Sequence, residues 1–344
     1  MAEEAPAPDP ATIDIGIFAH NEAGGIAAML GELARQDLFC APGRSVRVHL
    51  LANGCSDDTV AVARAAVASG WPGAPLVIHD LAEGGKSRTW NRFVHDLSRP
   101  EAGMLMFCDA DIRLPAADSL SRLVAHLEAR PGLQAVSSRP VKDMSHDNPP
   151  RGPVERLIAL AGGTLGDWKT SICGQLYVMP AAMARRFHLP VGLPVEDGFV
   201  RTMVASDVMR QPGDLSRLDG AEGVFHVYES ERRLGPLVRH QVRIIIGSAI
   251  NAQLFAELAE TPDVPATLER AAADPDWLGG VLSRRLPRWY GWVGTHFVTR
   301  RFHNWRRSPS LKRTAALIPG LAFDAVVYVI AQARMARGTG AGFW

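Results

Sequence analysis

Short apolar runs alternate with helix-like segments over the first 138 residues of the chain. The apolar runs, which we interpret as buried strands, lie at 12–19, 46–52, 76–79, 104–109 and 133–138. The segments between them have helical periodicity and lie at 26–36, 57–70, 86–93 and 119–130. Strands that alternate with helices at this spacing predict an α/β fold with a mostly parallel sheet flanked by helices.

The pattern changes after residue 138. Residues 142–153 are polar and contain prolines, which predicts a loop, and residues 154–165 predict a helix. Strand-like runs return at 172–179 and 224–228. Beyond Leu234 every long segment has a helical pattern.

These patterns divide the chain into three parts. We expect a disordered tail at 1–11, an α/β domain at 12–230 and a helical C-terminal region at 231–344. The tail is acidic and rich in proline and alanine, and it lacks the basic start and apolar core of a secretory signal.

Composition narrows the function classes. A net charge of +1 over 344 residues excludes a globally basic nucleic-acid-binding protein, and 47% hydrophobic residues suffice for a large core. The four cysteines are far apart and form no Cys-x-x-Cys pair, which indicates neither a zinc site nor a disulfide framework. A reducing, cytosolic setting fits this pattern best.

The apolar run that begins at Met104 ends in two carboxylates. Asp109 and Asp111 stand one residue apart where the predicted strand ends, and open α/β sheets bind ligands at that edge. Acidic groups at the end of an apolar strand are costly unless a cation or hydrogen-bond donors compensate them. A divalent metal carrying phosphates is the expected partner. The alternative is a carboxylate that caps the following helix.

Polar loops also follow the other early strands. They contribute His20, Asn21, Glu22, Asn53, Lys86 and Arg88. A lysine and an arginine at the start of a helix that follows two glycines can bind phosphate oxygens. The alternative readings are solvated surface charges for Lys86 or Arg88, and a structural Asn-Gly turn at Asn53.

Taken in order, these pieces resemble the family 2 glycosyltransferases, whose nucleotide-sugar-binding domain has the fold called GT-A. The resemblance covers about two thirds of the chain, from Thr12 to Tyr228. The pieces that carry it are His20-Asn21-Glu22, the loop 53–59, the segment 85–88 with Asn91, Asp109-Ala110-Asp111, Gly174-Gln175 and Glu196-Asp197.

The resemblance implies a metal and its ligands. In that family the Asp-x-Asp motif holds Mg²⁺ or Mn²⁺ against the diphosphate of the donor, which implies that Asp111 binds the metal directly and Asp109 acts through the ribose or a water. Some branches place a metal-binding histidine near the position of His226. A lone strand histidine is otherwise a packed, hydrogen-bonded residue.

The first two loops resemble the contacts to the base and ribose. This chain has Asn53 where an aspartate is common in the family. An amide both donates and accepts hydrogen bonds, whereas a carboxylate only accepts, so the identity of the base is left open. The last strand is followed by three charged residues, Glu229, Arg232 and Arg233. They could contact the diphosphate of a bound donor or form a charged surface turn, and both interpretations stay open.

Glu196-Asp197 matches the position of the family's catalytic base at the head of a helix. A carboxylate that takes the proton of the attacking hydroxyl gives an inverting single displacement. Asp197 is our choice for the base and Glu196 is the alternative; a helix cap is the structural reading of the same pair.

The resemblance therefore implies an inverting, metal-dependent glycosyltransferase that moves a sugar from a nucleotide-sugar donor to an acceptor hydroxyl of a lipid-linked or envelope glycan. A nucleotidyltransferase is the first alternative, but it would show a glycine-rich phosphate signature near the first strand. A silent nucleotide-sugar-binding scaffold is the second, and the retained Asp109, Asp111 and Asp197 argue against it.

The C-terminal region combines cations with aromatic residues. Residues 282–313 contain nine arginines and lysines and six aromatic residues, without any Asp or Glu. This mixture favours an anionic membrane surface and predicts a peripheral protein on the cytoplasmic face of the cell membrane. The apolar segment 314–333 contains Asp324, which disfavours a spanning helix. The alternative is a packed helical appendage or a homo-oligomer contact; no nucleic-acid recognition module is recognised.

Overall fold

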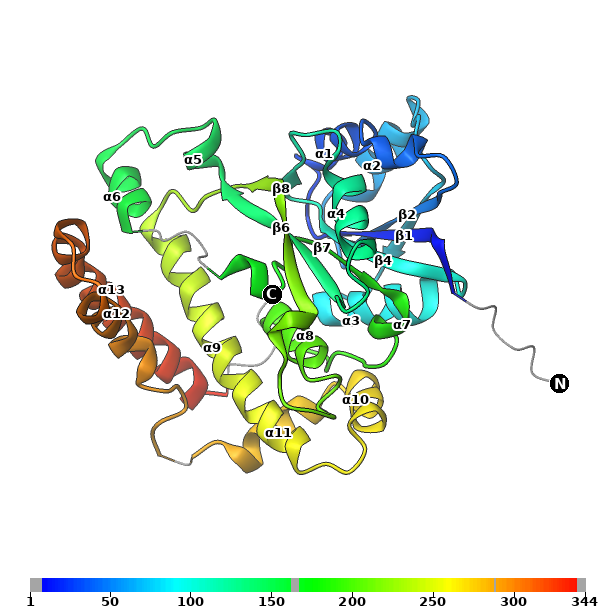
Figure 1. Ribbon diagram of the computed structural model, residues 1–344. Coiled ribbons are helices and arrows are strands. Elements are labelled where there is room, and N and C mark those ends of the chain that lie inside the picture. Colours follow the sequence, from blue (N-terminus) through cyan, green and yellow to red (C-terminus); the bar gives the residue numbers. More distant parts are fainter. Residues whose placement is uncertain (1–7, 162–166, 288, 339–344) are drawn as a thin grey trace.

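A single mixed sheet organises the protein (Figure 1). The computed structural model describes residues 8–161, 167–287 and 289–338. Its eight strands are ordered β3-β2-β1-β4-β7-β6-β8-β5. Their bounds are β1 Asp9–Ala19, β2 Ser45–Asn53, β3 Leu76–Leu81, β4 Ala102–Asp109, β5 Ile112–Arg113, β6 Ala135–Lys142, β7 Leu176–Pro180 and β8 Leu218–Tyr228.

The first four strands are parallel to one another, and so are β6 and β8. Strand β7 runs antiparallel to both β4 and β6, and the short β5 runs antiparallel to β8. The predicted α/β fold with a mostly parallel sheet is therefore confirmed. The antiparallel β7 joins its two parallel parts.

Side-chain alternation gives the sheet two apolar faces. Ile13, Ile15 and Ile17 on β1 belong to one buried cluster, and Phe18 with Phe107 of β4 belongs to the other. Successive side chains of a strand point to opposite faces, so a strand buried on both sides is apolar almost throughout. This explains why the central strands were recognisable as continuous apolar runs.

Helices cover both faces of the sheet. Those of the α/β part are α1 Ile26–Leu33, α2 Thr59–Ala68, α3 Lys86–Asn91, α4 Ser119–Glu128, α5 Asp143–His146, α6 Pro153–Ala161, α7 Ala181–Ala184 and α8 Glu196–Ala205. A π-helical turn, Arg92–Leu97, continues α3. Three 3-10 turns lie at Asp37–Cys40, Trp168–Thr170 and Leu215–Arg217.

The C-terminal region is helical, as predicted. It contains α9 Leu234–Ala259, α10 Val264–Ala273, α11 Trp277–Arg285, α12 His296–Arg307 and α13 Leu311–Ala336. Helix α13 packs against both α12 and α9. Figure 1 shows the pair α12 and α13 (orange to red) on the far side of α9 from the sheet.

Several element boundaries differ from the sequence prediction; β8, for example, begins at Leu218 rather than at 224. The predicted loop at 142–153 begins with the last residue of β6, which pairs with Tyr228 of β8, and then forms α5. Strand β1 starts at Asp9, within the expected disordered tail at 1–11, and the Asp9 amide donates to the Glu101 carbonyl (2.9 Å). Residues 1–7 of that expected tail lie outside the described residues. Only pairing with a distant strand defines these ends, and a local pattern does not record it. The last four residues of the predicted helix at 154–165 lie outside the described residues.

The sheet order creates a switch point beside β1. The chain proceeds from β1 to β2 on one side and later places β4 on the other. Loops that leave the carboxyl ends of such strands diverge and form a crevice where ligands bind in α/β sheets. Phe18 pairs with Asp109 at this edge, so the first loop and the Asp-x-Asp motif are neighbours.

Candidate active site

Asp109 is fixed at the end of β4 by backbone hydrogen bonds. Its amide donates to the carbonyl of Gln175 (2.8 Å), and the following amide of Ala110 donates to the carbonyl of Phe18 (2.9 Å). Asp109 follows the buried Phe107 by two residues, so its side chain points to the same face of the sheet as that ring. This is the face against which α3 packs Trp90, stacked on Phe107.

Lys86, at the first position of α3, lies between two carboxylates. Its ammonium nitrogen is 2.7 Å from Oδ1 of Asp109 and 2.9 Å from Oε1 of Glu196. Burial alone would lower the pKa of Lys86, but the two carboxylates outweigh burial and raise that pKa. Burial raises the pKa of Asp109 to about 7 although Lys86 opposes the shift. The predicted phosphate contact of Lys86 stays a prediction, because here its ammonium group binds protein carboxylates.

The edge next to Asp111 carries an excess of negative charge. Asp111 is exposed, and the pairing of Ile112 with Tyr228 sets it opposite Glu229 in the antiparallel register. Burial raises the pKa of Glu22 to about 7, and the charges of Asp111, Asp57 and Glu229 add to the shift. Four carboxylates from four separate segments therefore lie near enough at this edge for their charges to act on Glu22.

The loops after β1 and β2 are tied together. Asn21, with a φ of 56°, accepts a hydrogen bond from the Ser56 amide at 2.8 Å through its side-chain oxygen. The Nδ1 atom of His20 lies 2.7 Å from the Asn53 carbonyl. The side-chain oxygen of Asn53 is buried without a hydrogen-bond partner among the described residues. An amide oxygen in that state is suited to a ligand donor, because burying it unpaired is costly.

Gly54 allows the second loop to meet the third. It has a φ of 55°, and a Cβ atom at this position would lie 2.8 Å from the backbone of Gly84. A residue with a side chain would therefore be strained in φ and would push the loop of Lys86 away. Arg88, in contrast, is bound to Glu83 at 2.9 Å, and its predicted phosphate contact stays a prediction.

Glu196 and Asp197 form the first turn of α8. Glycine at position 174 leaves room for them, since a Cβ atom there would lie 3.1 Å from Cβ of Asp197 and 3.6 Å from Oε1 of Glu196. Asp197 accepts a hydrogen bond from the Gly198 amide (2.7 Å). Burial, together with the charge of Glu196, raises the pKa of Asp197 to about 6. A carboxylate in that range can exchange a proton near neutral pH.

His226 is fully buried on β8. Its Nδ1 atom lies 2.5 Å from the Ser138 hydroxyl, and its Nε2 atom lies 3.1 Å from the side-chain oxygen of Gln175. Burial lowers the pKa of this imidazole to about 3, so it is neutral. Both nitrogens are engaged by protein groups in this structure, and a metal-binding role for His226 stays a prediction.

Arg232 closes the loop that follows β8. It binds Asp143 at 2.6 Å and Glu155 at 2.9 Å. These contacts join α5 and α6 to the start of α9. No local sequence pattern indicates this network, because its members are about 80 residues apart.

The acidic edge fits a divalent cation that shares its shell with phosphates. Within the described ranges no three His, Cys, Asp or Glu side chains form a closed metal site. Mg²⁺ typically takes only one or two carboxylates when phosphate oxygens and waters complete its shell. Asp111 offers such a carboxylate, and the raised pKa of Glu22 records negative charge that a cation would offset.

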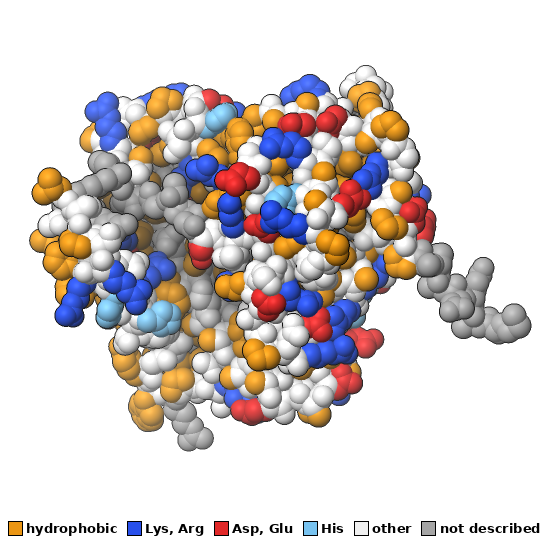
Figure 2. Space-filling model, in the orientation of Figure 1, with side chains coloured by type: hydrophobic (Ala, Val, Ile, Leu, Met, Phe, Trp, Pro, Cys, Tyr) orange, Lys and Arg blue, Asp and Glu red, His pale blue; other side chains and the backbone are white. Residues whose placement is uncertain are grey.

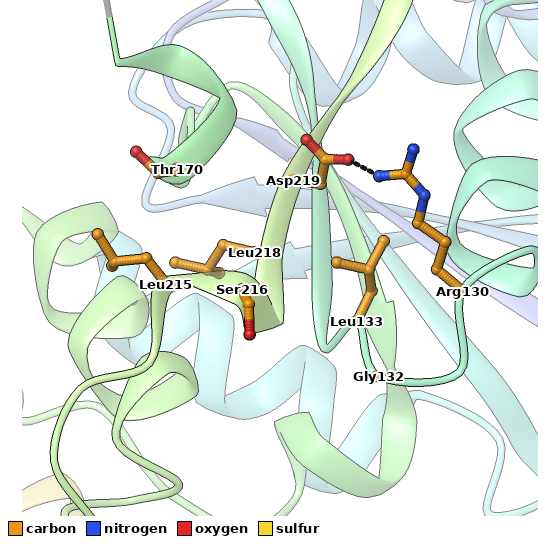
Figure 3. A pocket seen from close by; sticks show the side chains of 8 residues that line it. All are labelled: Arg130, Gly132, Leu133, Thr170, Leu215, Ser216, Leu218 and Asp219. Carbon is orange, nitrogen blue, oxygen red and sulfur yellow. Dashed lines mark hydrogen bonds and ion pairs between the residues drawn. The ribbon is translucent and has the colours of Figure 1, made fainter.

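A separate hollow lies at the opposite end of β8 (Figure 3). It is lined by Leu133, Leu215 and Leu218, and by the ion pair of Arg130 with Asp219. Leu218 is the first residue of β8, whereas Tyr228, next to the acidic edge, is the last. The hollow is therefore remote from Asp111.

Solved structures with the same architecture include glycosyltransferases. The chain aligns over 96% of its length with 89% of the mannosyltransferase PcManGT from Pyrobaculum calidifontis, solved with GDP-Man and Mn²⁺, at a TM-score of 0.56 and 19% identity. It aligns over 95% of its length with 92% of S. aureus TarS 1-349, at a TM-score of 0.48 and 11% identity. Neither a protein-family model nor a curated sequence gives a significant match. The similarity to PcManGT shows a shared fold, in agreement with the expected GT-A architecture.

Proposed function

We propose that this protein is an inverting, metal-dependent glycosyltransferase of the family 2 type. It moves a sugar from a nucleotide-sugar donor to a hydroxyl group of a lipid-linked or envelope glycan. The observation that carries the proposal is the bridge from Lys86 to both Asp109 and Glu196. It brings the end of β4 and the start of α8 to one edge of a sheet whose fold is shared with a mannosyltransferase.

The donor occupies the crevice beside β1 in this proposal. His20, Asn21 and Asn53 contact the base and ribose, and the unpartnered oxygen of Asn53 supports such a contact. Lys86 and Arg88 lie in the first turn of α3, and Lys86 contacts Asp109, so a diphosphate bound beside Asp109 would be within reach of Lys86. A diphosphate would compete with Asp109 and Glu196 for the ammonium group of Lys86.

Asp111 and Asp109 would hold Mg²⁺ or Mn²⁺. His226 would be a third ligand once its imidazole gives up the contact with Gln175 and binds the metal instead. When bound, the cation neutralises the charge that develops on the leaving nucleoside diphosphate. The mannosyltransferase with the shared fold was solved with Mn²⁺ and GDP-Man, which supports this assignment.

Asp197 acts on the acceptor. Its carboxylate takes the proton of the acceptor hydroxyl while that oxygen forms a bond to the anomeric carbon. The bond from the anomeric carbon to the diphosphate breaks, and its electron pair leaves with the nucleoside diphosphate. One displacement inverts the anomeric configuration. The raised pKa of Asp197, about 6, supports this role because the group is ionised at pH 7 yet basic enough to accept a proton.

We also propose that α12 and α13 bind an anionic membrane surface. The outward face of α13 is apolar, since Ile318, Val326 and Val329 are 79%, 52% and 64% exposed. Its inward face buries Asp324 and Gln332, 6% and 7% exposed, beside apolar residues such as Val327. Asp324 binds Arg301 of α12 at 2.8 Å, so its charge does not face outward. An outward apolar face with inward polar groups suits a lipid phase rather than water.

The positive charge of this face favours an anionic bilayer, rather than a second copy of the chain, as its binding partner. Arg300, Arg306 and Arg307 of α12 are exposed beside Phe302, and residues 282–313 contain no acidic residue. Figure 2 shows orange and blue side chains together at this side of the molecule. By length and composition, Leu234–Ala259 and Leu317–Ala336 could each cross a membrane, but the first is half buried in the protein. A helix pair lying on the bilayer fits these features.

Donor binding and product analysis test the proposal. Thermal-shift screening with UDP-, GDP- and dTDP-sugars in the presence of Mn²⁺ should identify a stabilising donor, and a ligand at a hundred times its Kd adds about 2.7 kcal/mol. A transferase releases a nucleoside diphosphate, whereas a nucleotidyltransferase releases pyrophosphate. Absence of stabilisation by any sugar nucleotide would contradict the proposal.

A further inference from the structure

One row of residues on helix α9 faces the start of α8. The Asn251 amide group donates to the Val195 carbonyl at 3.1 Å, and any Cβ atom at Gly247 would collide with the side chain of Val195. Arg243 precedes Gly247 by one helical turn on the same face. It therefore lies beside the entry to α8, where Glu196 and Asp197 begin the helix.

Two cations and a histidine gather at this place. Arg243 lowers the pKa of Asp197, so the two charges interact. His240 precedes Arg243 by three residues in α9 and therefore lies on the same face of that helix. Burial and the charges of Arg243 and Lys142 lower the pKa of His240, in agreement with this proximity. Lys142 belongs to the same sheet edge, because it pairs with Tyr228, which in turn pairs with Ile112 next to Asp111.

Asp197 offsets part of the charge of Arg243, but compensation of the cluster by the described residues is incomplete. The Nε atom of Arg243 is buried without a hydrogen-bond partner among the described residues. Burial lowers the pKa of Lys142, as expected for a half-buried ammonium group that has no adjacent carboxylate. Partly buried cations that are neither paired nor fully solvated are costly. A bound anion would offset that cost.

We infer that Lys142, His240 and Arg243 bind a phosphoryl group of the acceptor. A guanidinium, an ammonium and an imidazole from two elements can each bind one phosphoryl oxygen. A single carboxylate would engage these three groups less fully. The phosphoryl group then lies beside the start of α8 and positions a hydroxyl of the same molecule at Asp197. Calling the ligand an acceptor rests on the proposed function; the anion site itself does not.

Calorimetric titration in EDTA tests the site without donor, metal or turnover. Octyl phosphate and inorganic phosphate are the probes, and octyl glucoside is the uncharged control. We expect octyl phosphate to bind, and Arg243→Gln and Lys142→Gln each to weaken it at least tenfold. Arg239→Gln, an exposed arginine on the same helix, should leave the affinity within twofold.

The outcomes separate the two proposals. Equal affinity of wild type and both cluster variants, or an equal loss with Arg239→Gln, overturns the anion site. Tighter binding of octyl phosphate than of inorganic phosphate identifies a chain-bearing acceptor, and equal binding identifies a water-soluble phosphate. Stabilisation by sugar nucleotides with Mn²⁺, measured on the same variants, reports the proposed transferase independently and also shows that they fold.

Discussion

The ammonium nitrogen of Lys86 lies 2.7 Å from Asp109 and binds Glu196 at the same time. One side chain thus connects the strand end proposed to serve the donor with the helix start proposed to serve the acceptor. Asp109 is fixed by β4 and Glu196 by α8, so the contact joins segments that are about 90 residues apart. Its loss should affect both stability and the site.

Replacing Lys86 with methionine should destabilise the protein. The substitution keeps much of the side-chain volume but leaves two carboxylates without their counter-charge. Breaking a buried ion pair in this way typically costs about 3–5 kcal/mol. Urea denaturation of Lys86→Met measures the change. Lys169→Met is the matched control, because Lys169 pairs with Glu222 on the surface and such pairs contribute about 1 kcal/mol or less.

Asp111→Asn should remove metal-dependent turnover and leave the fold intact. The amide has nearly the same volume as the carboxylate but lacks its charge. A metal that acts as a Lewis acid contributes several kcal/mol, so the expected loss is at least about a hundredfold. Turnover at saturating Mn²⁺ and donor is the measurement. Asp118→Asn, an exposed aspartate a few residues away, should retain activity. Wild-type turnover in Asp111→Asn would falsify the metal assignment.

Asp197→Asn should bind the donor and lose most transfer, since an amide does not accept the acceptor proton. In the wild type, transfer should be constant above the pKa of Asp197, about 6. Below that pH it should fall about tenfold per unit, because protonation removes the base. A pH profile of kcat/KM checks both limbs. If Asp197→Asn is fully active, the base lies elsewhere, and Glu196 is the first candidate.

The stereochemistry of the product tests the same step independently. A single displacement with Asp197 as base inverts the anomeric configuration. Proton NMR of the product, recorded before mutarotation, distinguishes inversion from retention. A retained configuration would exclude the proposed displacement, whatever the activity of the Asp197 variant.

Much of the α/β part was predictable because its strands are buried on both faces. Apolar runs such as Ile13 to Phe18 need no knowledge of their partners to be recognised. The site residues at strand ends were predictable for the same reason, since Asp109 and Asp111 interrupt an apolar run. A local pattern therefore located the edge of the sheet, and family resemblance assigned the expected roles.

Long-range partners were not predictable. The local pattern around Lys86 predicts a contact with phosphate. Its contacts with Asp109 and Glu196 arise from the way α3 and α8 pack, which no local pattern records. Lys142 was assigned to a loop because only β8 extends its strand. Asp324 counted against insertion of α13 in a membrane, and the sequence did not show that Arg301 neutralises it. Each difference arises from a contact between segments distant in sequence.

The outward face of α12 and α13 predicts binding to anionic vesicles. Each arginine near an anionic surface contributes about 1 kcal/mol, and salt screens this contribution. Ile318, Val326 and Val329 should add apolar binding that salt does not remove. Co-sedimentation should therefore show strong retention on anionic vesicles, weaker retention on neutral ones and partial release at high salt.

The triple variant of Arg300, Arg306 and Arg307 to glutamine should lose about 3 kcal/mol of this binding, which corresponds to more than a hundredfold in affinity. Arg301 is left unchanged because its guanidinium binds Asp324 and holds the two helices together.

The matched control replaces three exposed arginines of the α/β part, Arg35, Arg64 and Arg92, with glutamine. Both triple variants lose the same net charge, so only a local effect separates them. If the two triple variants are retained equally on anionic vesicles, binding depends on overall charge rather than on α12. If the wild-type protein stays in the supernatant at low salt, the membrane proposal is wrong, and α12 and α13 form a packed appendage or a contact between copies of the chain.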